Sequence, residues 1–100
     1  MAALSRAQRA LVEAYREGLG QRAAARLSAG ELHNGALTAI ARVEDELARM
    51  QAAGALKAVN ASYRQYRLQA AGRGERVVPY AAWMLRYKAN LVREVAANLR

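Results

Sequence analysis

An apolar side chain recurs at alternating steps of four and three residues in the middle of the chain. The stripe consists of Ala36, Ile40, Val43, Leu47 and Met50. On a helix this spacing keeps the apolar side chains on one side and turns them toward a partner helix, as in a coiled coil. The same rhythm continues after a shift around Gly54, through Leu56, Val59, Tyr63, Tyr66 and Ala70. No strand pattern accompanies it, so the sequence predicts an all-α fold.

Capping and turn residues indicate where the helices begin and end. Ser5 with Gln8, and Ser28 with Glu31, have the spacing of a capping box, which marks a helix start. Glycines and Pro79 mark the loop before the last helix. We expect one domain over 1–100, with a short helix at about 5–18, a helix or helix pair at about 29–71, a loop at 72–78 and a C-terminal helix at about 79–99.

The stretch around Gly54 leaves two interpretations open. No Ser, Thr, Asp, Asn or Pro lies between Gln51 and Val59 to cap a new helix. One long helix with a phase slip at Gly54 and two helices forming a hairpin are therefore both compatible with the sequence.

The core that this chain can build is small. Of its 100 residues, 54% are hydrophobic, but 25 of these are alanines. Alanine favours helix and fills little volume, and a second copy would add the burial that one chain lacks. We expect a helical bundle, or a long antiparallel helical hairpin with a coiled-coil-like seam, completed by homo-oligomerisation. The predicted core or oligomer seam comprises Ile40, Val43, Leu47, Met50, Leu56, Val59, Tyr63, Tyr66, Trp83, Tyr87 and Leu91.

In the C-terminal helix, the spacing predicts that one stripe faces the interior. It comprises Tyr80, Met84, Tyr87, Leu91 and Val95, with Trp83 on its flank. Because Arg86 and Arg93 are seven residues apart, they share a face of this helix, which we expect to lie opposite the stripe.

The sequence contains no pattern typical of an enzyme or a metal site. It has no cysteine and a single histidine, His33. Glu44, Asp45 and Glu46 are consecutive, so on a helix they point about 100° apart and cannot bind one ion together. The lone "GRGE" at 72–75 lacks the frame of a phosphate-binding loop. We expect no catalytic residue, no metal ligand, no cofactor and no small-molecule substrate.

The sequence also contains no apolar run of the ~18 residues that a membrane-spanning helix requires. Arg6 and Arg9 interrupt the region where a signal peptide has its apolar core. The first twelve residues lack acidic side chains, which leaves a mitochondrial presequence conceivable. We expect a cytoplasmic protein with no membrane partner.

The positive charge is concentrated in the second half of the chain. The net charge is +8, and residues 55–100 hold nine basic and two acidic side chains. In the "SYRQYRL" segment (62–68), Arg64 and Arg67 each follow a tyrosine, so on a helix they lie about 100° around the axis from the tyrosines. The predicted binding residues for nucleic acid or a protein partner are Lys57, Asn60, Arg64, Arg67, Arg73, Arg76, Arg86 and Arg93.

Three functional hypotheses follow from this charge. The first is a small basic accessory protein of bacterial or phage type that binds nucleic acid, DNA in particular, largely without sequence preference. The second is an adaptor or inhibitor that docks its basic, tyrosine-bearing face on an acidic protein, since Arg and Tyr are common at interface hot spots. The third is a structural coiled-coil subunit.

Overall fold

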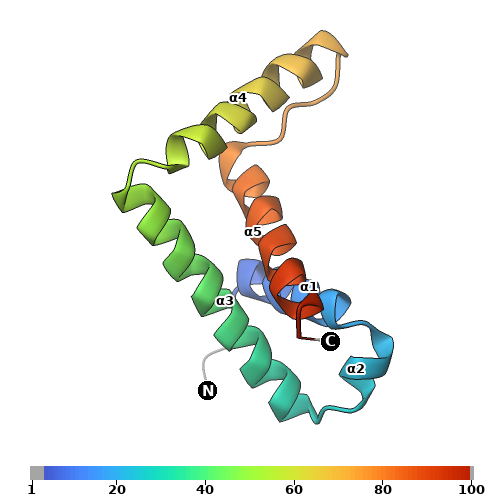
Figure 1. The fold of residues 1–100 in the computed structure, drawn as a ribbon. Helices are drawn as coiled ribbons and strands as arrows, with labels where there is room; N and C mark the ends of the chain where they lie inside the picture. Colours follow the sequence, from blue (N-terminus) through green and yellow to red (C-terminus); the bar gives the residue numbers. More distant parts are fainter. Residues whose placement is uncertain (1–3, 100) are drawn as a thin grey trace.

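The computed structural model describes residues 4–99, and every regular element in that range is a helix. The helices are α1 (Arg6–Leu19), α2 (Gln21–Ala25), α3 (Ala29–Ala52), α4 (Leu56–Gly72) and α5 (Tyr80–Ala97). Helices α1, α3 and α5 pack together and form what we call the body. Helix α4 and its connection to α5, residues 56–79, project from one end of the body as an arm (Figure 1). The predicted all-α fold is confirmed.

The stripe on α3 forms the centre of the body. Ala36, Ile40, Val43 and Leu47 are buried, and Met50 packs against the same core while remaining partly exposed. Their buried neighbours come from the other body helices: Leu11, Ala14, Tyr15 and Leu19 of α1, and Ala89, Val92 and Ala96 of α5. The stripe is therefore covered within one chain, without a second copy.

Helix α5 buries a different face from the one that its large apolar residues predict. Ala89, Val92 and Ala96 are buried, whereas Leu91 and most of the predicted stripe are only partly covered. The cause is the close approach of α1. A Cβ added at Gly18 would lie 2.4 Å from the carbonyl oxygen of Arg93 and 2.7 Å from Cβ of Ala96. Only small side chains fit between backbones this close, so the alanine face turns toward α1.

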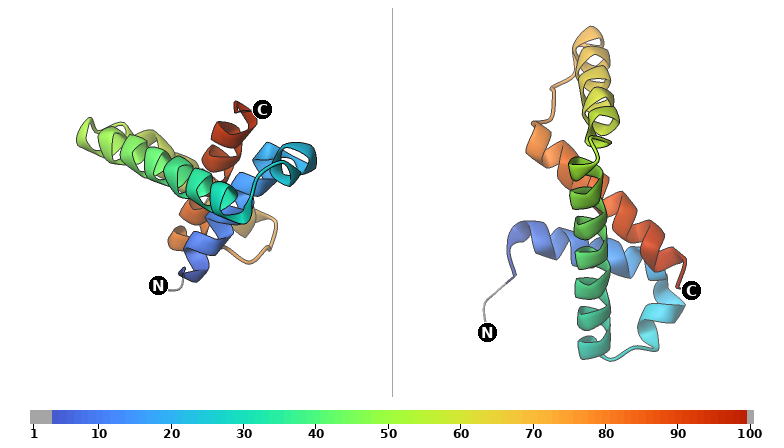
Figure 2. Two further views of the ribbon diagram at one scale, coloured as in Figure 1. Left: turned by 90° about the horizontal axis from the view of Figure 1, so that it is seen from below. Right: turned by 60° about the vertical axis from the view of Figure 1, so that its left-hand side comes forward.

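The chain forms two helices around Gly54, so the helix pair is confirmed and the single long helix is wrong. The two helices do not form the expected hairpin. Helix α3 ends at Ala52, and α4 neither continues it nor folds back along it, but runs away from the body (Figures 1 and 2). Gly54 has a φ of 75°, which glycine adopts without steric cost. The N–H of Gly54 donates to the carbonyl of Gln51, and that of Ala55 to the carbonyl of Met50. These two bonds form a Schellman motif, which satisfies the free carbonyls at the end of α3.

The arm gives the protein an extended shape with a large surface. The radius of gyration is 15.4 Å, compared with about 13 Å for a compact domain of 100 residues. The accessible surface is 7215 Å², whereas a compact monomer of this mass exposes roughly 5,600 Å². The difference, about 1,600 Å², is comparable to the total surface buried in a standard protein interface.

Both predicted capping boxes are present, and they differ in charge. At α1, Gln8 N–H donates to Ser5 Oγ, and Ser5 N–H donates to Gln8 Oε1. At α3, Glu31 N–H donates to Ser28 Oγ, and Ser28 N–H donates to Glu31 Oε1, each at 3.1 Å. The bond from the Ser28 backbone N–H, and after it the Ser28 side chain, lower the pKa of Glu31 below its ordinary value of 4.5.

Because Glu31 titrates and Gln8 does not, the capping box of α3 should stabilise the protein in a pH-dependent way, whereas the capping box of α1 should not. Because the pKa of Glu31 is lowered on folding, its contribution is fully present above pH 4.5 and is lost as the pH falls through the lower folded-state pKa. We expect the melting temperatures of wild type and Glu31→Gln to converge on acidification below pH 4.5. Gln8→Glu should introduce the same dependence at α1. Thermal unfolding from pH 7 to pH 3 measures both, and an unchanged gap between wild type and Glu31→Gln would contradict the prediction.

Candidate functional site

Tyrosine hydroxyls tie the two sides of the arm together. Tyr63 OH donates to the carbonyl oxygen of Val78 at 2.8 Å, and the N–H of Val78 donates to Tyr66 OH at 3.0 Å. At the base of the arm, Tyr80 OH donates to Asn60 Oδ1 at 2.7 Å. The tyrosines of "SYRQYRL" are therefore structural side chains of the arm, and Asn60, one of the predicted binding residues, is engaged in the same network.

Contacts between aromatic rings continue this network into the body. The Trp83 ring lies 5.2 Å from the Tyr63 ring and 5.9 Å from the Tyr87 ring, measured between centroids. Tyr63 also contacts Tyr80 edge-on at 5.1 Å and Tyr66 at 5.9 Å. We call these five residues, Tyr63, Tyr66, Tyr80, Trp83 and Tyr87, the aromatic cluster. Such ring pairs add to the free energy of burial, so the cluster fixes α4 on the first turns of α5.

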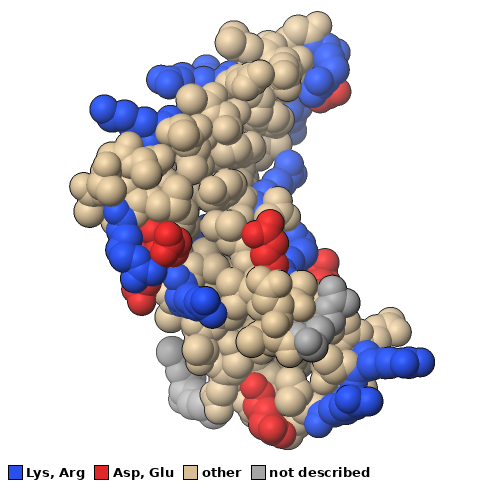
Figure 3. Space-filling view, viewed as in Figure 1, with Lys and Arg blue, Asp and Glu red and all other residues tan. Residues whose placement is uncertain are grey.

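The outer side of α4 carries an uncompensated positive charge. Lys57, Arg64 and Arg67, which we call the basic flank, are exposed. Helix α4 contains no Asp or Glu, and Glu75 is the one acidic residue between positions 47 and 93. On the face shown in Figure 3, basic side chains stand out from both edges of the α4 region, while acidic ones lie mainly over the body.

Two residues of the basic flank border a shallow depression in the arm. This arginine hollow, of about 360 Å³, is lined by Arg64, Arg67, Leu68, Ala71 and Val77. The guanidinium carbon of Arg67 also lies 6.0 Å from the centroid of the Tyr63 ring, a distance at which a cation is attracted to the ring face. The aromatic cluster therefore helps to position Arg67. The hollow combines two cations with apolar walls.

The basic residues among the predicted binding residues fall into two groups, those without a salt bridge and those with one. Within residues 4–99, Lys57, Arg64, Arg67, Arg76 and Arg86 make no salt bridge. Arg73, in contrast, lies 2.9 Å from Glu75, and this carboxylate raises the pKa of Arg73. Arg93 lies 3.3 Å from Glu17 of α1 and donates to Asn90.

Arg93 is also remote from the arm. It is thirteen residues along α5 from Tyr80, a separation of about 20 Å along the helix axis. Its ion pair with Glu17 connects α5 to α1. The structure therefore places the basic flank, with Arg76 beside Val77, in one region and Arg93 in another.

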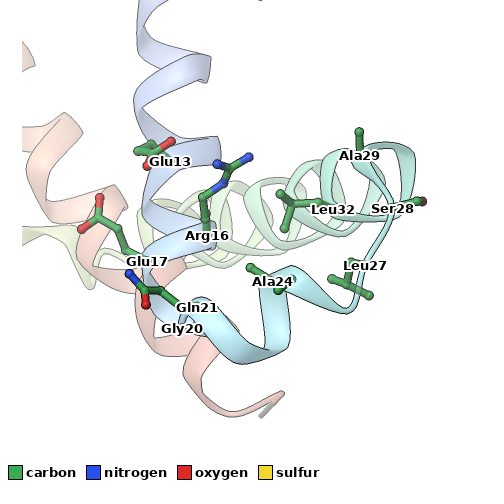
Figure 4. A pocket seen from close by; sticks show the side chains of 11 residues that line it. Glu13, Arg16, Glu17, Gly20, Gln21, Ala24, Leu27, Ser28, Ala29 and Leu32 are labelled. Atoms are coloured by element: carbon green, nitrogen blue, oxygen red, sulfur yellow. The ribbon is translucent and has the colours of Figure 1, made fainter.

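A hollow larger than that of the arm lies at the opposite end of the body, beside α2. It has a volume of about 720 Å³, and its apolar lining includes Ala24, Leu27 and Leu32. Figure 4 shows Glu13, Arg16 and Glu17 along its α1 side. The charged residues that line it are two carboxylates and one guanidinium, and Glu17 is paired with Arg93, so the lining has no excess of positive charge. The arm, whose hollow is lined by two arginines that make no salt bridge within the described residues, is the better candidate site for phosphate.

The residues with metal-binding or catalytic potential are dispersed. His33 is exposed, as are Glu44, Asp45 and Glu46. Glu46 pairs with Arg49 at 2.6 Å. Among residues 4–99, no three His, Cys, Asp or Glu side chains are grouped so that they could hold a metal ion.

No helix within 4–99 has both the length and the apolar character needed to cross a bilayer.

Leu68 and Val77 are part of the hollow but were not among the predicted site residues. Leu68 does carry a signal in the sequence, because it falls outside the rhythm that places Val59, Tyr63, Tyr66 and Ala70 on one side. A large apolar residue on the polar side of an amphipathic helix indicates either a partner or an exposed position. Val77 lies in a loop, where no periodicity applies.

Comparison with protein-family models, curated proteins and solved structures finds no match to this chain. The candidate function therefore depends on the chemistry of the arm.

Proposed function

We propose that the arm binds the sugar–phosphate backbone of nucleic acid, and of DNA in particular, largely without sequence preference. The observation that carries the proposal is the basic flank around the arginine hollow. Its cations are exposed and make no salt bridge within residues 4–99. Arg76, on the exposed connection next to Val77, adds a further charge at this place. Arginine forks match phosphate oxygens in a bidentate geometry.

The shape of the arm supports backbone contacts rather than reading of a base sequence. A helix-turn-helix joins its two helices with three or four residues, whereas residues 73–79 separate α4 from α5. Phosphate contacts release condensed counterions, and this sequence-independent release supplies most of the free energy of non-specific binding. A projecting, acid-free helix can approach a duplex without repulsion from carboxylates.

The proposal includes self-association of the protein. Six of the fifteen buried hydrophobic residues are alanines, so one chain buries little volume, and the extended shape leaves a large surface uncovered. Light scattering with and without a short duplex measures the mass of the protein and of its complex. Because the α3 stripe is buried within one chain, contacts between copies would have to use other surfaces. A monomer under both conditions would contradict this part of the proposal.

The test of binding removes two charges from the basic flank. We expect Arg64→Ala with Arg67→Ala to weaken binding of a short duplex by roughly 10- to 100-fold at about 50–100 mM salt, because two phosphate contacts are lost. The slope of log K against log salt should become shallower by roughly 1.8. Both residues are exposed, so the fold should be preserved, as circular dichroism would show. Fluorescence anisotropy at several salt concentrations measures affinity and slope together.

A matched control removes the same charge from another place. Arg22→Ala with Arg26→Ala takes two exposed arginines from the α2 region, and we expect nearly unchanged binding. Equal weakening by both pairs would show that overall charge, and not the arm, attracts DNA. No binding of DNA or RNA by the wild type at low salt would overturn the proposal and favour an acidic protein partner.

A further inference from the structure

Leu68 is the most exposed large apolar side chain in the described part of the molecule, residues 4–99. Its exposed fraction is 75%, compared with 60% for Leu99 and 42% for Tyr80. The hydroxyl of Tyr80 is bonded to Asn60, and Leu99 follows the end of α5. Leu68, in contrast, lies inside a regular helix. The other large apolar residues of α4 are buried or half-buried toward the aromatic cluster and α3, so folding of this chain makes no use of Leu68.

The surroundings of Leu68 point to an anionic ligand with an apolar interior. Leu68 shares the hollow with Arg64, one turn before it, and with Arg67, its neighbour. Ala71 and Val77 complete an apolar wall around it. No acidic residue occurs on α4. A ligand that fits has negative charges on either side of a flat apolar region, and a base-pair step flanked by its phosphates has this arrangement.

We propose that Leu68 inserts between adjacent base pairs of duplex DNA from the minor groove and kinks the duplex. Arg64 and Arg67 would contact phosphates beside the opened step. This inference depends on the proposed function and names the form of nucleic acid and the kind of contact. Apolar wedges such as Leu unstack a base step and bend the duplex toward the major groove.

The arm has the rigidity that such a wedge requires. Insertion has to separate stacked bases, so the helix that carries Leu68 must resist deformation more strongly than the base stack does. Tyr63 ties α4 to Val78 by a hydrogen bond and to Trp83 by ring contact. At the far end of α4, the N–H of Gly74 donates to the carbonyl of Ala71, and that of Glu75 to the carbonyl of Ala70, a second Schellman motif. Leu68 therefore lies on a helix that is tied to the body side through Tyr63 and capped at its far end.

The experiment measures bending and unstacking separately from affinity. A duplex labelled at both ends reports its bend by energy transfer, and 2-aminopurine in the same duplex reports unstacking by increased fluorescence. We expect the wild type to bend the duplex by roughly 20–90° and Leu68→Ala to bend it by less than about 10°. Leu68→Lys should bind at least as tightly as the wild type, because it adds a positive charge, yet should neither bend nor unstack the duplex. Leu99→Ala is the matched control and should behave as the wild type.

The possible failures are distinguishable. Binding of the duplex by the wild type without a bend or increased fluorescence would overturn the wedge and leave the proposed backbone contacts standing. Equal bending by the wild type and Leu68→Lys would also overturn it, since charge alone would then suffice. Absence of DNA binding at low salt would overturn the wedge together with the proposed function. Tight binding of single strands but not of duplexes would contradict the wedge while supporting a nucleic-acid function.

Discussion

Val43→Asp is expected to unfold the protein. Val43 is 5% exposed, near the middle of the α3 stripe that packs in the core shared with α1 and α5. A carboxylate in this position either remains charged without a partner or binds a proton, and both cost several kcal/mol. A small domain is stable by only about 5–15 kcal/mol, and the alanine-rich core places this protein toward the lower end. Far-ultraviolet circular dichroism and urea titration at pH 7 measure the loss of helix.

The matched control places the same charge on the other side of the same helix. Ala41 is exposed on α3, so Ala41→Asp should retain the fold and lose roughly 0.7 kcal/mol at most, the difference in helix propensity. A folded Val43→Asp protein with native helix content and lower mass would show instead that the α3 stripe lies between two copies. That result would contradict the packing of the stripe within one chain.

The starts of α1 and α3 could be predicted because they are determined by neighbouring residues. A capping box needs only a serine and a glutamine or glutamate three residues later, and both boxes form as expected at Ser5 and Ser28. The stripe on α3 was predictable for a similar reason. A helix alternates its faces by simple geometry, and Ile40, Val43 and Leu47 are buried accordingly.

The arrangement of the helices could not be read from one helix at a time. On α5 the large apolar residues mark one side, yet the deepest contact is made by alanines, because Gly18 lets the α1 backbone approach there. The burial of this alanine face can be recognised only once Gly18, more than seventy positions earlier in the chain, is known to pack against it. The direction of α4 has a comparable origin. It depends on the hydrogen bonds of Tyr63 and Tyr66 with Val78, and no periodicity predicts contacts between a helix and a loop.

The positive charge of the candidate site could be predicted from the sequence, but the set of residues that form the site could not. Arg64 and Arg67 stay on an exposed flank, where their helical spacing places them. Arg93 has a similar pattern in sequence and yet forms a tie to Glu17, because α1 happens to pass beside it. Charge patterns therefore identify a basic helix, whereas only the packing shows which cations remain unpaired.

Trp83→Ala is expected to release the arm from the body. Trp83 is half-buried, and its ring contacts Tyr63 of α4 and both Tyr80 and Tyr87 of α5. A buried tryptophan replaced by alanine costs about 3–5 kcal/mol, and partial exposure reduces this to about 2–4 kcal/mol. Since α4 makes only a small contact with α3, it has little else to hold it in place. We expect amide hydrogens in 56–72 to exchange far faster than in wild type, while those in 29–52 keep most of their protection.

The same substitution separates the position of the arginines from their mere presence. Trp83→Ala leaves every basic residue in the chain, so a ligand that responds only to net charge would bind it as it binds the wild type. We expect DNA affinity to fall nearly as far as in Arg64→Ala with Arg67→Ala, because a frayed α4 no longer holds its cations in register with phosphates. Trp83→Phe, which keeps a ring against Tyr63, should recover most of both protection and binding. Unchanged affinity in a Trp83→Ala protein whose α4 amides exchange freely would show that the folded arm is not the binding element.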